Sequence, residues 1–186
     1  NRGWRRRSRS SSGTASTPVY LTSLKDDSVS GDTNGDGAVS SPNMTNWNGI
    51  TFYQSSVGDI SNSVIRYSGG FNGTGRSAIF NLGGNLSLDN ILFSNNFQSD
   101  IYQNTGSSTI SHSTFSTNTN MVLSNTSTGT LDARMNWWGT DTGPSHSTNA
   151  TGTGPIVSDN VLFNPWLKRD PDLPNPVIIV PGILGS

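Results

Sequence analysis

The strongest constraint in this sequence is a short block that recurs three times after its first appearance, with two β-rich segments in each copy. The residues that open the copies, Ile50, Ile79, Ile101 and Val122, are 29, 22 and 21 residues apart. Each copy is too small to bury an apolar face by itself, so neighbouring copies must stack to form a core. A period near 22 residues with two strands per copy therefore predicts an all-β, coiled parallel sheet.

The second segment of each copy aligns into three columns. The first column is predicted to hold Ile60, Leu88, Ile110 and Leu131, and the second Ile65, Phe93, Phe115 and Asn136. Copies stacked about 4.8 Å apart would bury both columns as ladders. The third column contains Asn62, Asn90, His112 and Ala133. Because asparagine tolerates left-handed backbone, this column is predicted at the corners, with His112 as a corner residue rather than a catalytic base.

Composition limits the classes of protein and of site. Only 31% of the 186 residues are apolar and 12% are charged, but the apolar residues lie in register, which indicates a narrow, ordered core. The sequence has no cysteine, which excludes disulfides, thiolate metal sites and thiol nucleophiles. No apolar run reaches the roughly 18 residues that cross a bilayer, so we expect no membrane span.

Positive charge is concentrated at the start of the sequence. The first nine residues contain five of the eleven basic side chains, followed by a run of serines. A basic tract of this kind binds nucleic acid or acidic polysaccharide in some proteins. We expect instead a disordered basic, Ser-rich lead over residues 1–17, and no nucleic-acid partner.

Two stretches carry a resemblance to a known group of proteins. Asn136-Trp-Trp-Gly139 together with Asn164-Pro-Trp-Leu167 looks like the closing segment of bacterial secreted right-handed parallel β-helix (pectate-lyase-like) proteins. The stretch 21–50 resembles a long-looped coil of the same group. The resemblance covers about residues 18–167, and it implies a right-handed, single-stranded parallel β-helix, a solenoid, that is extracellular or on the cell surface.

The resemblance leaves two functions open, because β-helices include pectate lyases, other polysaccharide enzymes, adhesins and stalks. The leading expectation is a monomeric stalk or binding module with carbohydrate as the candidate ligand. The alternative is a polysaccharide lyase or glycosidase of β-helix type. No catalytic residue is assigned.

Residues 32–37, Asp-Thr-Asn-Gly-Asp-Gly, match the front half of an oxygen-ligand calcium loop. Alternate oxygen ligands along a tight turn suit Ca²⁺, although Asn43 replaces the glutamate usual at the twelfth position. Two acidic residues of the preceding segment are candidates to complete the shell. The predicted structural Ca²⁺ site comprises Asp26, Asp27, Asp32, Asn34 and Asp36, and the alternative is a solvated turn without an ion.

A polysaccharide enzyme would need a base or a carboxylate pair in a groove. The charged residues of the repeats fall in different columns and predict no acidic cleft: Asp59, Arg66, Arg76, Asp89, Asp100, Asp132 and Arg134. Five aromatic residues are candidates to stack on sugars: Tyr53, Tyr67, Tyr102, Trp137 and Trp138. The two tryptophans have a structural alternative, which is to cap the end of the apolar core.

The end of the sequence has a different character. Prolines in residues 168–176 predict an extended linker. Residues 177–186, Val-Ile-Ile-Val-Pro-Gly-Ile-Leu-Gly-Ser, resemble the first strand and oxyanion loop of lipase-like α/β-hydrolases, and the alternative is a terminal apolar strand. The resemblance implies that the β-helix precedes a hydrolase domain. The nucleophile elbow of that family is missing, so we expect no ester hydrolysis from these 186 residues.

Overall fold

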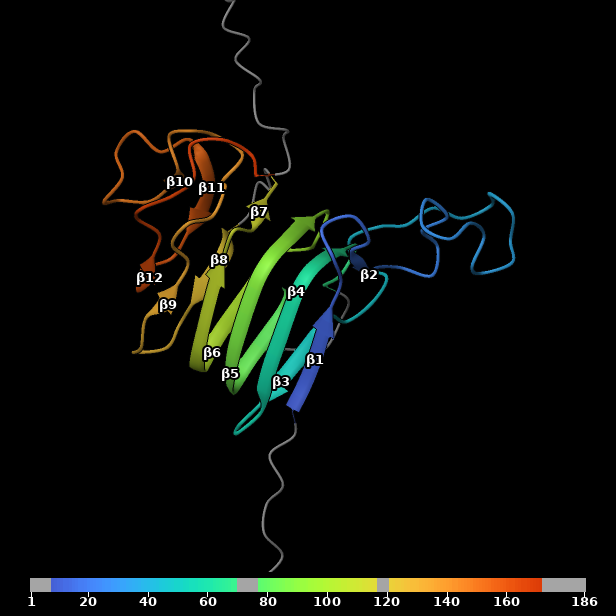
Figure 1. Ribbon diagram of the computed structural model, residues 1–186, viewed down its shortest axis with the longest axis horizontal. Coiled ribbons are helices and arrows are strands. Elements are labelled where there is room, and N and C mark those ends of the chain that lie inside the picture. Colours follow the sequence, from blue (N-terminus) through green and yellow to red (C-terminus); the bar gives the residue numbers. More distant parts are fainter. Residues whose placement is uncertain (1–7, 70–76, 117–120, 172–186) are drawn as a thin grey trace, which may run out of the picture.

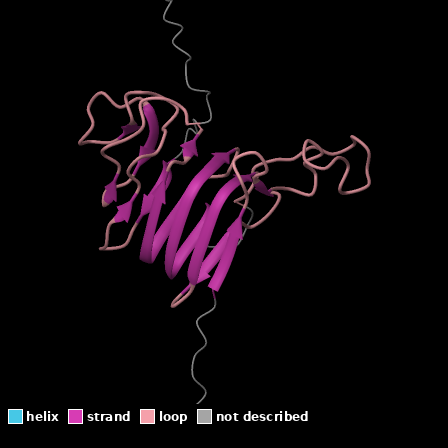
Figure 2. Cartoon of the chain, in the orientation of Figure 1, coloured by secondary structure: helices cyan, strands magenta, loops and turns pink. Residues whose placement is uncertain are grey.

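A computed structural model describes residues 8–69, 77–116 and 121–171 of the protein, and over these ranges it is an all-β structure without helices (Figure 2). Twelve strands belong to one sheet, and every pairing between them is parallel. The all-β, parallel character predicted from the repeat is therefore confirmed. Three predictions lie outside the described residues: the start of the basic lead, the stretch that includes Arg76, and the hydrolase-like segment.

The longest strands form the centre of the sheet, in the order β1-β4-β5-β6-β8-β11-β10 (Figure 1). The remaining strands pair alongside this path. The strands are β1 (Ser8–Ser12), β2 (Val19–Leu21), β3 (Ile50–Tyr53), β4 (Val57–Arg66), β5 (Ser77–Ser94), β6 (Ser99–Ser111), β7 (Thr114–Phe115), β8 (Met121–Asn125), β9 (Leu131–Asp132), β10 (Pro144–Ser145), β11 (Gly154–Val157) and β12 (Val161–Leu162).

Strand β1 lies in the segment that the sequence predicted as a disordered lead. It pairs in parallel with β4 and is an edge strand of the sheet. Serine-rich composition indicated flexibility, but Ser8–Ser12 need no apolar side chains of their own because backbone pairing to β4 holds them. The sheet therefore begins at least ten residues before the predicted boundary at residue 18.

The predicted columns are present in β4, β5 and β6. Ile60 pairs with Leu88, which pairs with Ile110, and all three side chains are buried. Ile65, Phe93 and the β7 residue Phe115 form the second column in the same way. Residues one period apart thus occupy equivalent places on neighbouring strands, which is how a weakly apolar sequence obtains a continuous core.

The fourth copy has a different register from the predicted one. In its first segment, Ile101 pairs with Leu123 rather than with Val122. Both Val122 and Leu123 are fully buried, so their apolar character does not distinguish the two registers. The structural repeat from Ile79 through Ile101 to Leu123 is consequently 22 residues at both steps.

The second segment of the fourth copy is shifted further. Thr109 pairs with Asp132, which places Ala133 rather than Leu131 beside Ile110. Side chains alternate along a strand, so a two-residue slip keeps the same face inward, and both Leu131 and Ala133 are buried. The predicted placement of Leu131 was wrong because the apolar pattern allows either register.

The same shift changes the end of the second column. Phe93 stacks on Phe115 with ring centroids 5.2 Å apart, and Phe115 stacks on Trp138 at 4.8 Å. Trp138, not Asn136, is therefore the fourth member. Such aromatic pairs stabilise a fold by about 0.5–1.5 kcal/mol each beyond their burial. Trp138 is fully buried at the end of this column, whereas Trp137 is only partly buried.

The corner column is occupied by residues with left-handed backbone, as predicted for its first three members. Asn62, Asn90 and His112 have φ angles of 46°, 53° and 50°. The Asn90 amide donates to the Asn62 side-chain oxygen at 2.8 Å, so the corners are also linked by side chains. The fourth corner is Met135, with φ 60°, rather than Ala133, because of the register shift described above.

Candidate metal centre

The segment between β2 and β3 contains the predicted calcium loop and extends away from the sheet, at the end opposite β10 and β11 (Figure 1). Its turn is organised by the Asp32 carboxylate, which accepts backbone N–H groups from Gly35 at 2.8 Å, Asp36 at 3.1 Å and Gly37 at 2.7 Å. Gly35 and Gly37 have φ angles of 73° and 71°, which glycine adopts without steric cost. The D-x-N-x-D-G pattern thus folds into a tight turn.

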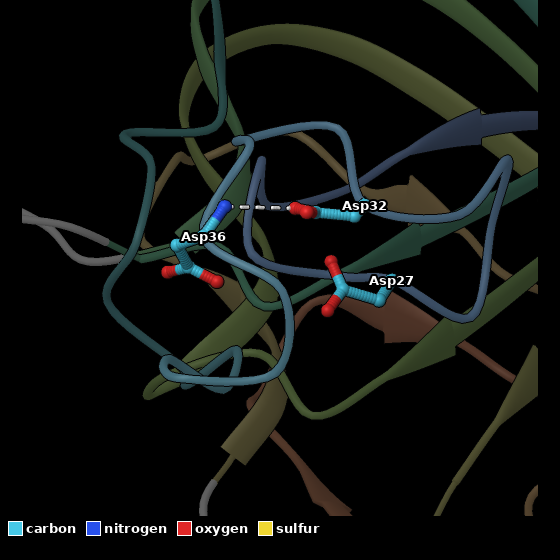
Figure 3. A group of neighbouring side chains, drawn as sticks. All are labelled: Asp27, Asp32 and Asp36. Carbon is cyan, nitrogen blue, oxygen red and sulfur yellow. Dashed lines mark hydrogen bonds between the residues drawn. The ribbon is translucent and has the colours of Figure 1, made fainter.

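Three carboxylates meet beside this turn. Asp27, Asp32 and Asp36 each offer an oxygen, and these atoms lie within 4.8 Å of one another (Figure 3). The Oδ1 atoms of Asp27 and Asp36 are buried and have no hydrogen-bond partner. Buried carboxylate oxygens normally accept hydrogen bonds or bind cations. The arrangement is chemically suited to a hard cation with oxygen ligands.

The electrostatics of the triad favour a positive charge between its members. Burial raises the pKa of the Asp27 carboxyl, and the neighbouring negative charges of Asp32, Asp36 and Asp26 raise that pKa further. The Asp36 carboxyl has a lowered pKa, chiefly because the Ser40 hydroxyl donates to it. A divalent cation would relieve the repulsion between the three carboxylates.

The other two predicted ligands lie differently. The Asn34 amide nitrogen donates to Asp36 Oδ2 and to Ser40 Oγ, both at 3.0 Å, so this side chain braces the turn. Asp26 is turned toward β4, where its Oδ2 pairs with Arg66 Nη2 at 2.6 Å. Of the five predicted residues, the structure brings together the carboxylates of Asp27, Asp32 and Asp36.

Arg66 anchors this projecting segment, a role that the sequence analysis missed. Its Nε donates to Asp26 Oδ2 at 2.7 Å, and its Nη2 donates to Ser28 Oγ. The Arg66 carbonyl accepts the indole N–H of Trp47, near the other end of the same segment, at 2.8 Å. One residue of β4 thus holds both ends. An arginine at the end of a strand has no local sequence signal that names a partner 40 residues away.

The carboxylates on the outer face of the sheet are dispersed. Asp59 and Asp132 belong to one row of paired residues in which Ser87 and Thr109 intervene, so about 14 Å separates them at the usual strand spacing. Asp89 lies diagonally across from Asp59, at about 8 Å by the same geometry. Asp89 Oδ1 accepts the Ser111 hydroxyl at 2.9 Å and lies 2.8 Å from His112 Nδ1.

Two shallow pockets of about 240 and 320 Å³ lie in the C-terminal half of the structure. Asp132 and Arg134 line the first, and the Arg134 guanidinium makes two hydrogen bonds to Asp132, of 2.9 and 2.7 Å. Phe163 and Trp166 line the second. Neither pocket contains the Asp59 and Asp89 carboxylates.

The candidate sugar-stacking aromatics differ in what their rings offer. Tyr102 stacks on Phe80 with centroids 4.8 Å apart, so one face of each ring is covered. Tyr67 lies under the Arg66 guanidinium, and Trp138 is buried. Tyr53, at 66% exposure, is the predicted aromatic most available to a ligand.

Comparison with known proteins finds no matching family model, and no curated protein or solved structure is significantly similar to the chain. Over the described ranges, no helix has the length and apolar character needed to cross a membrane.

Proposed function

We propose that the protein is a right-handed parallel β-helix that serves as an extracellular or cell-surface stalk or binding module, with carbohydrate as its candidate ligand. The observation that carries this proposal is the in-register parallel pairing of residues 22 apart, such as Leu88 with Ile110 and Phe93 with Phe115. Each coil of a β-helix places the next strand beside the previous one in this manner. The sequence resemblance to bacterial secreted β-helix proteins supports the same architecture and location.

A structural Ca²⁺ is part of the proposal. The residues that would hold it are Asp27, Asp32 and Asp36, whose carboxylates converge and include two buried oxygens without hydrogen bonds. Ca²⁺ takes six to eight oxygen ligands, so backbone carbonyls and water would complete the shell. Its contribution would be to neutralise the three carboxylates and to fix the projecting segment in one conformation.

The distribution of outward charges favours a stalk or binding module over an enzyme. Paired carboxylates of glycosidases lie about 5–9.5 Å apart on either side of the bond they cleave. Asp59 and Asp89 satisfy that separation, which makes a glycosidase the second candidate function. Both residues, however, lie on strands of an exposed sheet face, outside the pockets, where nothing encloses a substrate.

The experiment is a panel of neutral and acidic polysaccharides, assayed for binding and for turnover, with and without calcium. We expect binding without turnover, weakened by Tyr53→Ala. Turnover that disappears in Asp89→Asn, with folding intact, would establish the glycosidase and overturn the stalk proposal. We further propose that the module precedes a lipase-like hydrolase domain, on the resemblance of residues 177–186; the sequence beyond Ser186 tests this.

A further inference from the structure

Asp100 is a carboxyl buried in the interior of the sheet. Its side chain is 2% exposed, and the register of β6 places it beside Ala78 of β5 and Val122 of β8, both fully buried. Within the described residues, the hydrogen bond found for its carboxylate comes from the Asn96 amide, at 2.9 Å. A carboxylate in such surroundings loses hydration without gaining a cation.

Asn96 is held so that its NH₂ group faces Asp100. Its side-chain oxygen accepts the backbone N–H of Ser68 at 3.1 Å and the Ser68 hydroxyl at 3.0 Å. Its amide nitrogen also donates to the carbonyl of Ile65, at the end of β4, at 3.0 Å. The Asn96–Asp100 pair therefore links the end of β4 to the start of β6, and the neutral amide cannot compensate a full negative charge.

The charged groups of the surrounding elements are directed elsewhere. On β4, Arg66 bonds Asp26, and on β5, Asp89 lies against His112. Strand β8 has no titratable residue. The remaining titratable groups of these elements are Asp59 on β4, Tyr67 after β4 and Tyr102 on β6, and none contributes to the electrostatics of Asp100. Burial raises the pKa of the Asp100 carboxyl to about 7.

We propose that the Asn96–Asp100 pair is a pH-sensitive latch, closed when Asp100 is protonated and loosened when it ionises. The folded protein holds this proton more tightly than the unfolded chain, whose carboxyl ionises near 3.8. The contribution of the latch to stability is therefore fully present below pH 3.8 and declines as the pH rises from there to about 7. This makes the corner between β4 and β6 more stable in mildly acidic surroundings.

Thermal unfolding of the 186-residue chain between pH 5 and pH 8 tests the latch. We expect the Tm of the wild type to fall by about 5–10 °C over this range because of Asp100, a part that Asp100→Asn lacks. The variant should melt above the wild type at pH 8. Asp59→Asn makes the same chemical change at an exposed carboxyl and should follow the wild type. Parallel Tm curves for wild type and Asp100→Asn would overturn the proposal.

A measurement on the wild type does not depend on the folding of any variant. Carbon-13 NMR of aspartate side chains should reveal one carboxyl carbon that titrates near pH 7. If every aspartate in the folded protein has titrated by pH 5, Asp100 is ionised at neutral pH and the latch does not exist.

Discussion

Two regions of this molecule hold their chain in place by opposite means. At the end of the second column, Phe93, Phe115 and Trp138 stack face to face within the core, so order comes from apolar burial repeated at a fixed period. The segment between β2 and β3 interrupts the period and has few buried apolar side chains. It is held by the Asp26–Arg66 pair and by the carboxylate-capped turn at Asp32. Where the repeat is kept, stacking is sufficient; where it is broken, specific polar contacts replace it.

The largest effect is expected in the stacked column. Phe115→Ala would leave a cavity between Phe93 and Trp138, and we expect a loss of about 3–5 kcal/mol in the free energy of unfolding. Denaturant unfolding measures this loss. Tyr53→Ala, at an exposed aromatic on β3, is the matched control and should change stability by no more than about 0.5 kcal/mol. Equal effects of the two substitutions would mean that the column is not a filled core.

Removing the anchor of the projecting segment should have a smaller effect. Arg66→Gln leaves the buried Asp26 carboxylate without its cation, for which we expect a loss of about 2–3 kcal/mol in the free energy of unfolding. Arg134→Gln removes the guanidinium of an exposed pair with Asp132 and should leave the Tm nearly unchanged. If both variants melt alike, the Arg66 contacts do not anchor the segment.

Calcium tests the polar region without altering the core. A ligand that binds only the folded state at 100 times its Kd should raise the Tm by about 5–10 °C. We expect this rise for the wild type between chelator and saturating calcium, and its loss in Asp36→Ala. Asp141→Ala, an exposed aspartate outside the triad, should retain it. A wild-type Tm that ignores calcium would leave a solvated turn in place of a metal site.

The sequence predicted the parts of the fold that depend on periodicity and missed those that depend on distant partners. The columns through β4, β5 and β6 follow from apolar residues 22 apart. The fourth copy was placed two residues early because Leu131 and Ala133 both face inward. In the site, the acidic spacing predicted Asp32 and Asp36, whereas the separation of Asp26 from Asp27 depends on Arg66, which is adjacent only in three dimensions.

The most direct test of the stacked parallel architecture is NMR of the wild-type protein. Nuclear Overhauser contacts between backbone amide and α protons identify neighbouring strands and their direction. In-register parallel pairing predicts such contacts from Leu88 to both Ile60 and Ile110, and from Phe93 to both Ile65 and Phe115. Antiparallel contacts, or contacts from Leu88 to a residue outside this column, would contradict the repeat as the basis of the fold.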